Sequence, residues 1–229
     1  MPLAYLQAGA ANSDTRIIFI HGSPGSKEGY QAYLSNEDLL NRAQLLSVDR
    51  LGFGNSGKEV VTSLQQQAEA ILPFLDSSRN NILVGHSLGG PIALQLALIS
   101  PESISGMVLI ASAFDPALEQ PKWYNYLADT IVANWILPED MNRSNREMMV
   151  LSQELKELAD QSWQELTMPI RLLHGDDDTI AAPGNSLFAY ARLPTQSTTL
   201  HMMKNEGHFV LWQNVPQIVR EILSLIEDK

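Results

Sequence analysis

The chain has 229 residues, of which 45% are hydrophobic and 18% are charged, a composition typical of a folded globular protein rather than a disordered or fibrous one. Its formal net charge of -11 disfavours binding to nucleic acid or to an anionic membrane, because most of the surface repels phosphate groups. Since the sequence contains no cysteine, disulfides, thiolate metal sites and a cysteine nucleophile are excluded.

The sequence shows no sign of a membrane-spanning or exported segment. No apolar run reaches the roughly 18 residues that a transmembrane helix needs. The first residues, Met1 to Gly9, lack the basic segment and the long apolar stretch of a signal peptide. We therefore expect a cytoplasmic protein, and leave open that an amino-terminal export signal was removed. The sequence does not indicate an oligomeric state.

Aliphatic and β-branched residues recur in short runs that end at turns, and helical patterns separate these runs. The runs predict strands at residues 16–20, 43–48, 81–84, 106–110, 170–173 and 197–202. The spacing of apolar residues predicts helices at 63–75, 88–99, 148–166 and 215–226. This alternation favours an α/β fold, in which helices flank a mostly parallel central sheet of about six strands.

The segment Phe114 to Leu166 interrupts the alternation. It contains no convincing strand, and its last part has the spacing of an amphipathic helix. The sequence also shows no internal repeat and no Gly/Ser linker. We therefore expect one domain over residues 1–229, with residues 114–166 inserted in it as a helical lid.

A serine stands at a predicted turn from strand to helix, in Gly85-His86-Ser87-Leu88-Gly89. Small residues on both sides of Ser87 allow the sharp, strained turn that exposes a nucleophilic hydroxyl. The helix that follows offers unpaired N–H groups, including that of Leu88, where negative charge develops on an acyl oxygen. Ser87 is thus our candidate nucleophile; a simple helix N-cap serine is the alternative.

A serine hydroxyl needs a neighbouring base, and histidine suits that task near neutral pH. We favour His208, which lies in the loop between the last predicted strand and the final helix. The triad acid is expected in the turn His174-Gly175-Asp176-Asp177-Asp178. We prefer Asp178 to the two preceding aspartates, because a few residues are needed before a side chain can reach the histidine loop. Loops at the carboxyl ends of parallel strands share one edge of the sheet, so these side chains can converge there.

The glycine-rich turn His21-Gly22-Ser23-Pro24-Gly25 follows the first predicted strand. Such a turn can present a backbone N–H to an oxyanion, and we expect Ser23 and Leu88 to be the two donors. An ordinary loop is the alternative. In the lid, Trp123 and Trp135 are our candidates for the wall of an apolar substrate pocket, with ordinary packing as the competing explanation.

These motifs, with nucleophile, acid and histidine in that chain order, make the sequence resemble the α/β-hydrolase superfamily. His21 to Gly25 is similar to the HGxPG turn of that family, and Asp49 to Ser56 is similar to its DxxGxGxS segment, which we interpret as structural. The resemblance implies the α/β-hydrolase fold, with residues 114–166 as a cap over the active site. One departure is that only Met1 to Thr15 precede the first predicted strand, whereas family members usually carry a longer amino-terminal portion.

The function that we expect is that of a carboxylesterase-like serine hydrolase, which cleaves an ester of small or medium size with a hydrophobic group. The same triad serves enzymes that cleave amide, lactone, thioester or carbon–carbon bonds, and an aminopeptidase acting on proline is among the alternatives. A non-catalytic receptor for a small molecule is a further alternative. We expect no cofactor and no metal, because the sequence lacks a phosphate-loop motif and its histidines lack ligand spacing.

Overall fold

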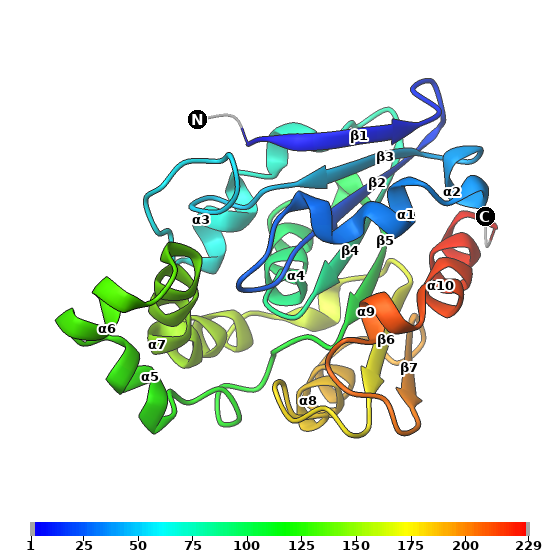
Figure 1. Ribbon diagram of the computed structural model, residues 1–229. Coiled ribbons are helices and arrows are strands. Elements are labelled where there is room, and N and C mark those ends of the chain that lie inside the picture. Colours follow the sequence, from blue (N-terminus) through cyan, green and yellow to red (C-terminus); the bar gives the residue numbers. More distant parts are fainter. Residues whose placement is uncertain (1–2, 228–229) are drawn as a thin grey trace.

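The computed structural model describes residues 3–227, without the side chains of residues 131 and 134. Within this range seven strands form one sheet in the order β1-β3-β2-β4-β5-β6-β7 (Figure 1). The strands are β1 (Tyr5–Gly9), β2 (Thr15–Ile20), β3 (Gln44–Val48), β4 (Asn80–His86), β5 (Ile104–Ile110), β6 (Ile170–Gly175) and β7 (Thr198–Met203). β1 pairs with β3 in the antiparallel sense, and the other neighbouring strands are parallel.

The predicted α/β fold with a mostly parallel central sheet is confirmed, and the six predicted strands correspond to β2 through β7. The sequence does not predict β1. Its five residues alternate between exposed and half-buried positions, so they lack the apolar run that marks the inner strands. β1 forms because its backbone pairs with that of β3 along the whole of its length.

Helices cover the sheet and also form a separate group between β5 and β6 in the chain. They are α1 (Gln31–Leu34), α2 (Glu37–Leu40), α3 (Leu64–Glu69), α4 (Gly89–Ile99), α5 (Trp123–Ala128), α6 (Ile131–Ile136), α7 (Glu139–Ala159), α8 (Gly184–Arg192), α9 (Val210–Gln213) and α10 (Val215–Glu227). Short 3₁₀ helices lie at Lys27–Tyr30, Leu72–Phe74, Pro101–Ser103 and Trp163–Glu165. α7 begins earlier and ends earlier than the predicted helix at 148–166, because its first turns are too polar to show apolar periodicity.

Alternate residues of the inner strands bury their side chains on opposite faces of the sheet. In β2, Ile17 and Phe19 join a core with residues of α1, α9 and α10. Ile18 and Ile20 join a second core with residues of α3, α4, α7 and α8. The result is three layers, with helices packed on both faces of one sheet (Figure 1).

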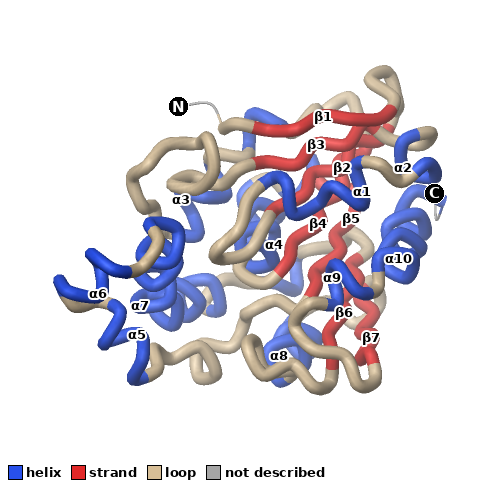
Figure 2. The backbone as a smooth tube through the Cα atoms, in the orientation of Figure 1, coloured by secondary structure: helices blue, strands red, loops and turns tan. Residues whose placement is uncertain are grey.

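The helices α5, α6 and α7 lie together at one side of the sheet (Figure 2). The chain enters this group after β5 and leaves it before β6, so the insertion does not interrupt the sheet. Figure 1 shows the group next to the end of the sheet at which the parallel strands finish. In an open parallel sheet that end is where ligands bind.

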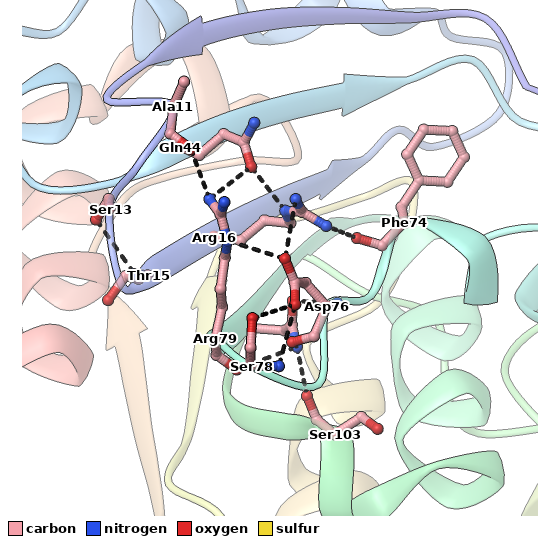
Figure 3. Close-up of polar contacts among 11 residues, drawn as sticks. Ala11, Ser13, Thr15, Arg16, Gln44, Phe74, Asp76, Ser78, Arg79 and Ser103 are labelled. Carbon is pink, nitrogen blue, oxygen red and sulfur yellow. Dashed lines mark hydrogen bonds and ion pairs between the residues drawn. The ribbon is translucent and has the colours of Figure 1, made fainter.

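A polar network joins the amino ends of β2, β3 and β4, at the other end of the sheet (Figure 3). The amide oxygen of Gln44 accepts hydrogen bonds from Arg16 at 2.8 Å and from Arg79 at 3.1 Å. Asp76 pairs with both arginines, at 3.6 Å from Arg16 and 2.9 Å from Arg79. Because each of these side chains is bonded to another member of the network, we interpret the network as holding together the loops that precede the strands.

Candidate active site

Ser87 occupies the turn between β4 and α4 with a φ of 52°, a left-handed conformation that residues other than glycine rarely adopt. The turn leaves the line of the strand at once, so the side chain is lifted away from the sheet. The backbone N–H of Ser87 donates to Ile110 O at 2.9 Å, and Gly90 N–H donates to Ser87 O at 3.0 Å. Strand β5 and the first turn of α4 therefore hold the strained residue in place.

The two glycines of the G-x-S-x-G motif are required by close backbone contacts. A Cβ atom on Gly85 would lie 2.5 Å from Gly89 O, and one on Gly89 would lie 2.1 Å from Ile20 O. Both distances are far below van der Waals contact. The motif thus reflects how tightly β4, α4 and the end of β2 pack around the serine.

The turn that follows β2 lies against the nucleophile. Ile20 is opposite Gly85 in the sheet, so the next residues of both strands come side by side. A Cβ atom on Gly22 would be only 2.8 Å from Ser87 Cβ. Among the described residues, we find no protein acceptor for the backbone N–H of Ser23 or of Leu88. These two groups are therefore available to an oxyanion on Ser87.

His208 and Asp178 form a hydrogen-bonded pair, with 2.7 Å between His208 Nδ1 and Asp178 Oδ2. The other carboxylate oxygen of Asp178 accepts from the backbone N–H of Ile180 and of Ala181, at 2.8 and 3.0 Å. Because Nδ1 carries the proton toward the carboxylate, Nε2 of the neutral ring is an acceptor and can serve as a base. Asp176 and Asp177 are exposed and stand outside this pair.

The surroundings of Asp178 favour its ionised form. Burial by itself raises the pKa of the carboxyl group, but hydrogen bonds from His174 and His208 and from backbone N–H groups outweigh that effect and bring the pKa below its ordinary value. His174 Nε2 lies 3.2 Å from Asp178 Oδ2. A carboxylate that stays ionised can stabilise the positive charge that a base acquires when it takes a proton.

Ser87 and His208 line the same cavity, which has a volume of about 390 Å³. We call it the aromatic cavity, because its wall includes Tyr30, Phe209 and Trp212. Among the described residues, no protein group forms a hydrogen bond with the Ser87 hydroxyl. Hydrogen bonds between a nucleophile and its base are often long until substrate binds. The arrangement brings together the three predicted catalytic residues at one edge of the sheet.

Two buried histidines beside the site are held neutral. Burial and the nearby His208 lower the pKa of His86 to about 3, and burial together with the charge of Arg50 lowers that of His21. His86 Nε2 donates to the backbone oxygen of His208 at 3.1 Å, and His21 Nδ1 donates to Gly22 O at 2.8 Å. Each neutral ring therefore supports a loop that carries a candidate site residue.

These low pKa values predict a protein that loses stability in acid. Below about pH 6.5 an unfolded chain protonates its histidines, whereas folded His86 stays neutral down to about pH 3, so the free energy of unfolding falls over this range. In His86→Gln we expect the unfolding temperature to fall less steeply between these pH values than in the wild type, as measured by circular dichroism. His201→Gln, on the surface, is the matched control. A wild-type slope in His86→Gln would contradict the prediction.

A buried ion pair, Arg50–Glu147, connects helix α7 to the turn after β2. The side chains of Arg50 and Glu147 are 0% and 2% exposed, and Arg50 Nη1 lies 2.7 Å from Glu147 Oε1. Arg50 also donates to the backbone oxygens of His21 and Gly22, at 2.9 and 3.0 Å. The hydroxyl of Ser23 donates to Glu147. The pair therefore holds the turn after β2 in place and ties it to α7.

Removal of one member of this pair should be costly. In Arg50→Met, Glu147 is left as a buried charge without its partner, and we expect a loss of about 3–5 kcal/mol in the free energy of unfolding, measured with urea. Arg42→Met is the control, because Arg42 pairs with Glu227 on the surface and should cost at most about 1 kcal/mol. Equal losses in the two variants would show that the buried pair has no special role.

A second cavity, of about 480 Å³, lies beneath the helices of residues 114–166, and we call it the cap cavity. Its wall includes Ser23, Ser87 and Leu88 at the base, with Tyr124, Met148 and Leu151 from the helices. Glu119 also lines it and accepts a hydrogen bond from Asn185 at 2.8 Å. Burial raises the pKa of Glu119 above its ordinary value.

The structure places neither predicted pocket tryptophan in the wall of either cavity. Trp123 is 73% exposed and Trp135 is 90% exposed, since α5 and α6 turn these side chains toward solvent. The tyrosine next to the first of them, Tyr124, is the aromatic residue that reaches the cap cavity. The sequence does not show which of the two adjacent aromatic residues faces the cavity, because successive residues of a helix point in different directions and the orientation of this short helix was unknown.

Sequence reasoning also missed Arg50 and Glu147. Arg50 lies in the segment Asp49 to Ser56, which we interpret as structural, and its hydrogen bonds to the turn after β2 agree with that interpretation, although this side chain was not singled out. Its signal was an arginine placed directly after a buried strand. Glu147 had no such signal, because it is one of several carboxylates on a polar helix and its partner is 97 residues away.

Within residues 3–227 we find no group of three or more side chains suited to bind a metal ion. The helices described there include none whose length and hydropathy would let it cross a membrane.

The strand order, with the candidate site at the carboxyl ends of the parallel strands, defines a protein of the α/β hydrolase class. The chain belongs to the alpha/beta hydrolase family, whose model matches residues 17–221. The monoglyceride lipase of Rattus norvegicus is 24% identical over 248 residues, which cover 92% of this chain and 80% of that protein. A mitochondrial palmitoyl-protein thioesterase of the same species is 28% identical over 205 residues, covering 84% and 68%.

The fold is also that of solved structures. The crystal structure of the monoacylglycerol lipase of Paleococcus ferrophilus matches with a TM-score of 0.78 and 20% identity, over 100% of both chains. At this identity the likeness establishes the fold alone.

Proposed function

We propose that this protein hydrolyses carboxylic esters through an acyl-enzyme on Ser87. The observation that supports this most is that the strained serine lines one cavity with His208, whose ring is oriented by Asp178 at 2.7 Å. This arrangement leaves Nε2 of the imidazole as the base on the side of the nucleophile. The names of the two rat relatives, a lipase for monoglycerides and a thioesterase for palmitoyl-proteins, support acyl transfer to water.

The reaction has two steps. His208 takes the proton of the Ser87 hydroxyl as the oxygen attacks the ester carbonyl carbon, and the carbonyl electron pair moves to an oxyanion held by the N–H groups of Ser23 and Leu88. When this intermediate collapses, the bond to the alcohol oxygen breaks and that oxygen takes the proton from His208. Water then repeats the sequence on the acyl-enzyme, which releases the acid and restores the serine.

We further propose that residues 114–166 act as a cap that shapes the acyl site. Their helices supply much of the wall of the cap cavity, which is mostly apolar and has a volume of about 480 Å³. A cavity of this size and character suits a small or medium hydrophobic acyl group. A thioester of such an acid would react through the same carbonyl chemistry.

The test combines labelling and turnover. A fluorophosphonate should modify the wild type at Ser87, and a panel of ester, thioester, lactone and proline-arylamide substrates should show fastest turnover of the esters. Absence of both labelling and turnover would favour a non-catalytic receptor on this fold. Turnover of the arylamide in preference to every ester would replace the proposal with an aminopeptidase.

A further inference from the structure

Two cavities meet at the candidate nucleophile. Ser23, Ser87 and Ile180 line both the cap cavity and the aromatic cavity. Leu88, an oxyanion donor, belongs to the wall of the cap cavity. His208 belongs to the wall of the aromatic cavity and not to that of the cap cavity. The base therefore stands on one side of the serine.

The chemistry assigns the two halves of an ester to these two cavities. In the tetrahedral intermediate, one bond of the central carbon goes to Ser87 and another to the oxyanion near Ser23 and Leu88. The two remaining groups are the acyl chain and the alcohol oxygen. Since His208 must deliver its proton to the alcohol oxygen, the alcohol lies on the His208 side and the acyl chain lies in the cap cavity.

We propose that the aromatic cavity is the leaving-group subsite and that it selects esters of flat, apolar alcohols of the benzyl type. This inference rests on the proposed ester hydrolysis. Neighbouring rings form an aromatic surface next to the base. The ring centroids of His208 and Phe209 are 6.0 Å apart, and those of Phe209 and Trp212 are 5.9 Å apart. Such a surface favours stacking or edge contact with a second aromatic ring.

Charge distinguishes the two cavities. Among the described residues, the wall of the aromatic cavity contains no Asp, Glu, Lys or Arg, whereas that of the cap cavity contains Glu119 and Lys122. A charged or polyhydroxylated alcohol that entered the aromatic cavity would give up water without finding enough partners. An apolar alcohol gains from the same burial.

The wall of the aromatic cavity is held in shape before any ligand binds. Trp212 Nε1 donates to Gly29 O at 2.8 Å, and its ring meets that of His86 edge to face with centroids 5.0 Å apart. The volume of about 390 Å³ is ample for one ring, given that a cavity of ~150 Å³ can bind benzene. A preformed wall costs little ordering on binding, which strengthens its selectivity.

The first experiment varies the alcohol at a constant acyl group, using methyl, benzyl and 2,3-dihydroxypropyl butyrate. In Trp212→Ala we expect the ratio of kcat/KM for the benzyl ester to kcat/KM for the methyl ester to fall by about ten- to a hundredfold relative to the wild type. In each protein the deacylation rate should be the same for all three esters, because they give the same acyl-enzyme. Trp135→Ala is the matched control, since that tryptophan lines neither cavity.

The second experiment uses the wild type alone and so does not depend on how a variant folds. During turnover of 4-nitrophenyl butyrate, an added alcohol can attack the acyl-enzyme in place of water, by the reverse of acylation. Benzyl alcohol should form its butyrate ester faster than glycerol does at equal concentration.

Equal trapping by benzyl alcohol and glycerol, or a Trp212→Ala variant that keeps the wild-type preference for the benzyl ester, would overturn the leaving-group assignment while ester hydrolysis at Ser87 stands. If no ester is turned over in a Ser87-dependent manner, the proposed function itself fails, and the subsite fails with it.

Discussion

Ser87→Ala should lower kcat for ester hydrolysis by about 10⁶-fold, because the variant has no oxygen to attack the carbonyl carbon. Alanine fits the space of the serine, and the hydrogen bonds that hold Ser87 to Ile110 and Gly90 use its backbone, so the fold should persist. The measurement is steady-state turnover of a short-chain ester, combined with thermal unfolding of the variant. Fluorophosphonate labelling should disappear in parallel.

The control for this variant is Ser13→Ala, which removes a hydroxyl that donates to a backbone oxygen far from the site. We expect this control to retain wild-type kcat. If Ser87→Ala keeps most of its activity while it remains folded, the nucleophile has been misassigned and the acyl-enzyme mechanism fails.

Asp178→Asn should lower kcat by about 10⁴-fold with little change in geometry, because an amide no longer fixes the proton on His208 Nδ1 or stabilises the charged ring. The variant should also be less stable at pH 7. The lowered pKa of Asp178 means that its carboxylate contributes stability above about pH 3.9, and this contribution is lost as pH falls toward the pKa of the folded state. The stability difference between variant and wild type should therefore narrow only in strong acid.

Asp176→Asn is the matched control, since Asp176 is exposed and bonds to Asn205 N–H at 2.6 Å in the neighbouring loop. Its kcat should stay within about twofold of the wild type. A larger effect at this position than at Asp178 would mean that the wrong carboxylate has been assigned to the histidine.

The sheet was predictable because its inner strands are buried on both faces and their sequences are short runs rich in apolar residues. The strand β3, for example, is buried at every one of its five positions. The early start of α7 was not predictable in the same way. Its first turns carry Glu139, Asp140 and Arg143, and they follow no apolar pattern because this part of the helix lines a cavity, whereas its later turns pack on the core.

In the candidate site, too, features set by local contacts could be predicted from the sequence, and features set by distant contacts could not. The turn at Ser87 could be predicted, because close backbone contacts within the turn and with the end of β2 require its glycines, and glycines are visible in the sequence. The length of the turn after His174 favoured Asp178 over the two preceding aspartates, and the structure shows Asp178 bonded to His208. The Arg50–Glu147 pair and the separation of the two cavities depend on how residues 114–166 pack against the sheet. That packing could not be predicted from a single sequence.

The strand β1 supplies none of the catalytic candidates, yet it covers an edge. It pairs with β3, whose five residues are all buried and whose backbone would otherwise present a row of unpaired groups next to apolar side chains. A variant that lacks β1 would keep each candidate catalytic residue, but its exposed β3 edge could pair with a strand of another molecule. We therefore expect the loss of β1 to increase aggregation while leaving the candidate catalytic residues in place.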